Sequence, residues 1–196
     1  MQGADPKEVI VDWLVQPSVV ISESRGEGGL VVGQVRQGGQ EADPATIRFL
    51  KERSIPGRQI HAVAFESLMD GRRFNALWTV QLIQDDSGNW QMRGGSGGGD
   101  DGPIREHPWA NLGGGGSPDE FCMGGRVIDN GLAIARVRLV TGNGLTPEDS
   151  VDDGLVLFLT DQRVELPIHT ELYDRPGVPV ARHEVISELG CELPPS

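Results

Sequence analysis

The feature that most constrains the fold of this chain is an alternation of apolar and polar residues with a period of two. The clearest example lies between Arg73 and Gln84, where every second residue is apolar: Phe74, Ala76, Trp78, Val80 and Leu82. Similar alternation returns in residues 132–141 and 164–172. Because successive side chains of a strand point to opposite faces, the pattern predicts strands that each bury one face. We therefore predict a mainly β (α+β) fold of antiparallel sheets, with one or two short N-terminal helices.

Two segments near the N-terminus carry helix signals. Asp5 is placed to cap a helix that begins at Pro6, and Glu8 completes a capping-box spacing. The same segment also alternates like a strand as far as Val15, and we favour the helix. A second helix is predicted from Asp43 and Pro44, with Ile47 and Leu50 on one face, ending at Pro56-Gly57.

The remaining N-terminal segments are predicted to be strands. Residues 18–24 and 30–36 flank a glycine-rich turn, which indicates a hairpin. Three strands follow at residues 59–66, 73–84 and 89–93, separated by turns at Asp70-Gly71 and 85–88. Residues 1–93 are thus interpreted as an α+β half.

The chain changes character between Gly94 and Gly116, where ten of 23 residues are glycine. Glycine loses more backbone entropy on ordering than any other residue, so we interpret residues 94–117 as a linker or long loop. Its anchors would be Ile104, Pro108, Trp109 and Leu112.

Residues 118–196 are predicted to form a β-sandwich-like half. Five short strands with regular turn signals between them are typical of an immunoglobulin-like sandwich or a half-barrel. The segment from Leu155 to Leu159 is apolar on both faces, which predicts a central strand.

Composition disfavours several classes of function. The formal charge of −12 disfavours nucleic acid and membrane surfaces as partners, because both are anionic. No secretory signal or membrane-spanning run is recognisable, so we expect a cytoplasmic protein. Cys122 and Cys191 have no zinc or redox spacing, and whether they form a disulfide stays open.

Two glycine motifs lack the sequence context that their chemistry needs. Residues 94–98 match GxSxG around Ser96, but a nucleophile elbow requires a helix after the serine, and residues 99–103 build no apolar helical face. Residues 97–102 match GxGxxG, but Asp100 and Asp101 would repel a pyrophosphate. We therefore expect no catalytic residues.

Two sets of residues are candidate binding sites. Arg105, His107 and Trp109 join a cation, a titratable ring and an indole within the glycine-rich segment, which favours ligand binding; the alternative is that Trp109 pins the loop. Calcium requires six to eight oxygen ligands, and loops of a sandwich can supply them. The candidate carboxylates are Asp100, Asp101, Asp149, Asp152 and Asp153, and the alternative is that they are solvated turns.

These observations leave three functional hypotheses. The first is a non-catalytic interaction or structural module with an unknown protein partner and no cofactor. The second starts from the helix and three strands that end at Asn89–Met92, which resemble the NTF2-like cone fold. That resemblance implies a small-molecule-binding or enzymatic domain with an apolar pocket, for which Phe74, Trp78 and His61 are candidate lining residues. The third is a calcium-binding β-sandwich.

Overall fold

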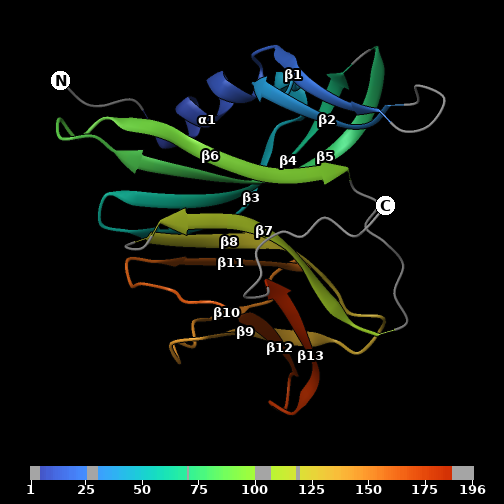
Figure 1. Ribbon diagram of the computed structural model, residues 1–196, viewed down its shortest axis with the longest axis vertical. Coiled ribbons are helices and arrows are strands. Elements are labelled where there is room, and N and C mark those ends of the chain that lie inside the picture. Colours follow the sequence, from blue (N-terminus) through green and yellow to red (C-terminus); the bar gives the residue numbers. More distant parts are fainter. Residues whose placement is uncertain (1–4, 26–30, 70, 100–106, 118–119, 187–196) are drawn as a thin grey trace.

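The computed structural model describes residues 5–25, 31–69, 71–99, 107–117 and 120–186. They form a mostly antiparallel β structure with a single α-helix in the described residues (Figure 1). No helix of the described part is long and apolar enough to cross a membrane. The elements are α1 Pro6–Leu14, β1 Ser18–Arg25, β2 Val31–Gly38, η2 Pro44–Thr46, β3 Arg48–Ile55, β4 Arg58–Met69, β5 Arg72–Gln84, β6 Trp90–Gly99, β7 Trp109–Ser117, β8 Glu120–Ile128, β9 Ile134–Thr141, β10 Glu148–Ser150, β11 Leu155–Thr160, β12 Ile168–Asp174 and β13 Pro179–Ile186.

Helix α1 forms where its capping signals predict. The Asp5 carboxylate accepts a hydrogen bond from the Lys7 N–H at 2.8 Å, and Pro6 occupies the first turn. Ile10 and Leu14 are fully buried at helical spacing. The helix therefore forms because its apolar face packs against a sheet, which outweighs the β-branched residues at its centre.

The second predicted helix is wrong. Asp43 and Pro44 do start a helical turn, and the Asp43 carboxylate accepts from the Ala45 N–H, but that turn is the three-residue 3-10 helix η2. The chain then continues as β3, which pairs antiparallel with β4. Pairing with β4 thus determines the structure of this segment, and a local capping signal cannot reveal such pairing.

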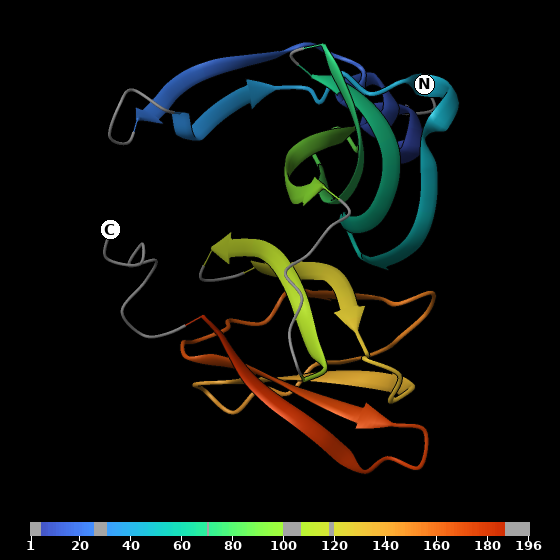
Figure 2. The same ribbon diagram turned by 90° about the vertical axis from the view of Figure 1, so that its right-hand side faces the viewer.

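Three sheets are stacked along the long axis of the molecule (Figures 1 and 2). The upper sheet has the order β3-β4-β5-β6, the middle sheet β11-β8-β7, and the lower sheet β10-β9-β12-β13. Hairpin β1-β2, confirmed as predicted, is a separate two-stranded sheet. The middle and lower sheets make the sandwich predicted for the C-terminal half.

Each layer boundary has its own apolar core. Helix α1 packs on the upper sheet through Ile10, Leu14, Val63, Phe65, Val80 and Leu82. The upper and middle sheets meet through Ile60, Ala62, Cys122, Leu155 and Leu157, and the middle and lower sheets through a larger set that includes Val137, Leu139, Phe158 and Leu172. Strand β11 is therefore buried on both faces, but the prediction of a central strand is wrong: β11 is the terminal strand of its sheet and is covered by the sheets above and below it.

The glycine-rich segment contains two long strands. Residues 94–99 belong to β6 and residues 109–117 to β7, where the sequence indicated a linker or loop. Pairing with β5 and β8 supplies the backbone hydrogen bonds that offset the entropy cost of ordering glycine. On β6, Gly95 and Gly97 lie under the Trp78 indole, and a Cβ at Gly97 would lie only 2.6 Å from Trp78 Cγ. This close approach explains glycine at these two positions.

Candidate functional site

The interface between the upper and middle sheets has one closed half and one open half. On the closed side, β3 and β4 meet β11, where Ile60 and Ala62 pack against Leu155 and Leu157. On the open side, β5 and β6 lie across from β7 and β8, and glycine and polar residues replace most of the large apolar side chains. The open half is called the inter-sheet cleft below.

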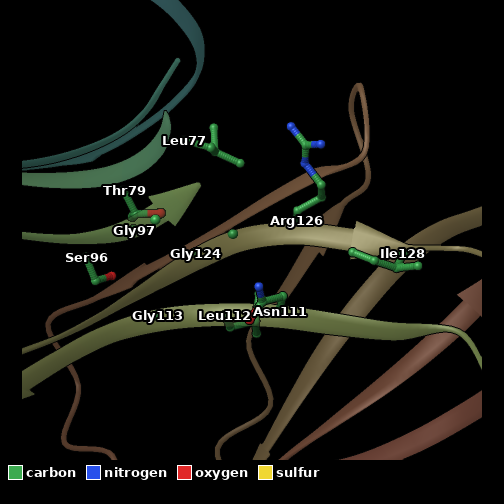
Figure 3. A pocket seen from close by; sticks show the side chains of 12 residues that line it. Leu77, Thr79, Ser96, Gly97, Asn111, Leu112, Gly113, Gly124, Arg126 and Ile128 are labelled. Carbon is green, nitrogen blue, oxygen red and sulfur yellow. The ribbon is translucent and has the colours of Figure 1, made fainter. Parts of the chain in front are cut away.

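Strand register determines which side chains enter the inter-sheet cleft. On β5, Trp78, Val80 and Leu82 pack on the helix side, so the alternate residues face the middle sheet. Figure 3 shows Thr79 and Ser96 on one side of the cleft and β7 and β8 on the other. The cleft is lined by Leu77, Thr79, Gln81, Gly94, Ser96, Gly98, Asn111, Gly113, Gly115, Cys122, Gly124 and Arg126.

Gly113 of β7 lies close to Ser96 of β6 across the cleft. A Cβ at this glycine would lie 2.5 Å from the Ser96 hydroxyl oxygen, so no other residue fits without movement. Two hollows share Thr79 and Ser96 in their walls. The larger, of about 310 Å³, extends towards Arg126 and Ile128, and the smaller, of about 210 Å³, extends towards Gln81 and Cys122.

Two buried hydrogen-bonding groups in the smaller hollow have no partner among the residues that the structure describes. They are Gln81 Nε2 and Ser96 Oγ. Cys122, a free thiol, donates weakly to the Gly115 carbonyl at 3.5 Å, and burial raises the pKa of this thiol. The hollow therefore offers neutral donors, because a buried thiol with a raised pKa stays protonated.

The outer edges of β6 and β7 lie beside the cleft. Each is a terminal strand of its sheet, and no described strand pairs with its outer edge. Gly95, Gly97 and Gly98 of β6 and Gly114 and Gly115 of β7 are exposed. The open side of the molecule thus presents two glycine strands whose backbone is accessible.

The predicted ligand-binding set does not come together as one site in the described residues. Arg105 lies outside them. His107 is exposed, whereas Trp109 is buried at the start of β7. Beside it, His183 Nε2 lies 2.6 Å from the Pro108 carbonyl oxygen and joins β13 to the chain entering β7.

The predicted calcium ligands have different surroundings. Asp100 and Asp101 lie outside the described residues, and Asp153 is exposed. The Lys51 ammonium lies 2.7 Å from an Asp149 carboxylate oxygen and 2.8 Å from one of Asp152, so a lysine holds the place that a cation would take between them. The described residues contain no group of three or more His, Cys, Asp or Glu arranged to hold a metal ion.

The three residues proposed to line an apolar pocket do not share one environment. Trp78 packs against Trp13 with ring centroids 5.9 Å apart, Phe74 is exposed, and His61 is buried with its ring edge-on to Phe49. Burial lowers the pKa of His61, which favours its neutral form. Ser96 lies within strand β6, with no strand-to-helix turn such as a nucleophile elbow requires.

Sequence reasoning missed the residues of the inter-sheet cleft. Thr79 and Gln81 alternate with the apolar residues of β5, and this polar row was the available signal for a second, polar face. Nothing in the sequence shows that β7 and β8 would lie opposite that face.

Comparisons with protein-family models, curated proteins and solved structures found no match to this chain.

Proposed function

We propose that this protein is a non-catalytic interaction module that binds an extended segment of a partner protein by strand addition to β6 or β7. In strand addition, the partner's backbone pairs with an unpaired sheet edge, and neighbouring hollows accept its side chains. The single observation that carries the proposal is the pair of accessible glycine edges beside the inter-sheet cleft.

Three other terminal strands of the described sheets, β11, β10 and β13, differ from these two. At the outer edge of β11, the Leu157 N–H donates to the Asp149 carboxylate at 2.7 Å, and β3 packs beside it. Strand β10 has only three residues, and β13 begins at Pro179 and carries exposed charges. Short length, proline and charge are the usual devices that prevent unwanted pairing of edges.

The glycine portions of β6 and β7 carry none of these devices. Residues 94–99 and 113–117 contain no charged residue and no proline. Without side chains, a partner's backbone can approach to the normal strand spacing of about 4.8 Å. An edge left unprotected in this way is suited to pairing with an extended peptide.

A peptide selection tests the proposal with synthetic partners. Random peptides displayed on phage are selected against the folded protein, and the best binder is then synthesised with N-methyl groups on alternate residues. Strand addition predicts that methylation of one alternate set abolishes binding, because those N–H groups donate to the protein edge, while methylation of the other set is tolerated. Binding that tolerates methylation of both sets contradicts the proposal, as does failure to select any binder.

Two matched variants locate the binding edge. Gly98→Lys places a charged side chain on β6, at a position where a Cβ meets no atom within 4 Å. Asn75→Lys makes the same change of charge at an exposed position of β5, an interior strand. Gly115→Lys makes the same change on β7. We expect either Gly98→Lys or Gly115→Lys to weaken peptide binding, depending on which strand the peptide pairs with. Asn75→Lys should leave peptide binding unchanged.

A further inference from the structure

We infer that the smaller hollow of the inter-sheet cleft is a binding site for a small neutral molecule that presents carbonyl or hydroxyl oxygens to Gln81 and Ser96. The inference does not depend on the proposed strand addition, although Gly98 and Gly115 border the inter-sheet cleft as well as belonging to the two edge strands. The smaller hollow lies between the sheets, whereas strand addition uses the outer edges of β6 and β7.

The walls of the hollow come from four strands. Thr79 and Gln81 project from β5, Gly94, Gly95 and Ser96 belong to β6, Gly114 and Gly115 to β7, and Cys122 to β8. The hollow has a volume of about 210 Å³, and Thr79 and Ser96 also line the larger hollow of about 310 Å³. A small ligand therefore fits between the sheets without displacing the apolar core on the closed side.

The unpartnered donors define the chemistry of the ligand. A buried amide N–H without an acceptor is costly, so most buried polar groups in proteins are hydrogen-bonded. Here two such groups, Gln81 Nε2 and Ser96 Oγ, line the same hollow. Because both atoms are covered in this structure, the Gln81 and Ser96 side chains would have to rotate towards the hollow to donate to an oxygen acceptor there.

The lining also indicates that the ligand is uncharged. Of the described residues, no aspartate, glutamate, lysine, arginine or histidine lines the smaller hollow, and Cys122 is a buried thiol that donates to a carbonyl. An ion placed there would lose its hydration without gaining a counter-charge. A neutral amide, heterocyclic carbonyl compound or polyol has the required oxygens without that penalty.

Glycine contributes to the site by leaving space. A Cβ at Gly94 or Gly115 would meet no atom within 4 Å, so packing within the protein does not require glycine at these positions. Larger residues there would extend into the hollow. This contrasts with Gly113, where close approach to Ser96 alone explains the glycine.

The test uses three neutral probes, namely nicotinamide, uracil and N-acetylglucosamine, with the full-length protein. Binding is followed by ligand-observed saturation-transfer NMR and by protection of Cys122 from a small thiol reagent in a Cys191→Ser background. The site predicts that at least one probe binds with a Kd of about 1 mM or tighter and slows modification of Cys122. If none of the three binds, or if a bound probe leaves Cys122 modification unchanged, the inference is overturned.

Two variants separate this site from nonspecific binding. Gln81→Leu removes the unpartnered amide, and Gly115→Val fills the hollow at a position with open space. Both should fold, because neither removes a hydrogen bond made within the protein, and both should weaken probe binding by about tenfold or more. Gly144→Ala in a distant turn, at a φ of +80°, is a control that changes stability without touching the hollow. Equal binding by Gln81→Leu, Gly115→Val and the unmodified protein would show that the hollow holds water only.

Discussion

At the scale of single residues, the most unusual feature is the burial of Lys51. Its side chain is only 4% exposed, and its ammonium bonds to Asp149, Asp152 and the carbonyl oxygens of Ser150 and Leu155. Pairing of β3 with β4 shifts register between Phe49 and Lys51, and this bulge turns Lys51 towards the middle sheet. The lysine thereby connects the upper sheet to β10 and β11.

We predict that Lys51→Met lowers the free energy of unfolding by about 1–3 kcal/mol, because Asp149 keeps its ion pair with Arg53 but the buried carbonyl oxygens of Ser150 and Leu155 lose a donor. Arg73→Met, which breaks an exposed ion pair with Glu66, should cost less than about 1 kcal/mol. Chemical denaturation of both variants measures the difference. Equal effects would contradict a structural role for the buried lysine.

The same lysine makes part of the stability depend on pH. Its hydrogen bond holds the pKa of Asp152 below the ordinary value of 3.8. The stability that this carboxylate contributes is therefore present above pH 3.8 and is lost as the pH falls through the lower, folded value. Lys51→Met should reduce that acid-dependent loss, as measured by denaturation at pH 5 and below, whereas Arg73→Met should leave it unchanged.

At the scale of elements, the two glycine strands use glycine for different reasons at neighbouring positions. At Gly97, a Cβ would lie 2.3 Å from the Leu77 carbonyl oxygen, whereas at Gly98 it would meet nothing within 4 Å. The two residues alternate between the helix side of the upper sheet and the inter-sheet cleft.

This difference makes a matched pair of substitutions. Gly97→Ala should destabilise the protein by about 1–3 kcal/mol, the typical cost of overpacking, because Leu77 and Trp78 must move. Gly98→Ala should be neutral or stabilise by up to about 1 kcal/mol, because it restricts the unfolded chain at no steric cost. Thermal denaturation measures the stability of both variants. Equal destabilisation would show that the register of β6 differs from the one described here.

Most elements were predictable from sequence because local pattern determines them. Hairpin β1-β2, strands β4 and β5 and helix α1 follow from alternation, turn residues and the Asp5-Pro6 cap. Strand β3 and the glycine strands were not predictable, because their structure comes from pairing with neighbours rather than from local preference.

At the scale of the whole molecule, the arrangement of layers creates the candidate site. The upper sheet packs on the middle sheet through isoleucine, alanine and leucine on one side and through glycine, serine, threonine and glutamine on the other. Sequence indicated both β-rich halves, and Thr79 and Gln81 were visible as a polar row. The stacking of one half on the other, which brings Ser96 to Gly113, depends on contacts between distant segments and could not be inferred.

The central claim is that β6 and β7 are ordered strands with accessible outer edges. Residue-resolved amide hydrogen exchange tests it most directly, without and with the peptide selected for binding. We predict period-two exchange in β6, β7 or both: amides paired with β5 or β8 exchange slowly, and the alternate amides exchange fast and become slow when the peptide binds. Uniformly fast exchange across residues 94–99 and 109–117, or outer-edge amides that are already protected without the peptide, would contradict the account.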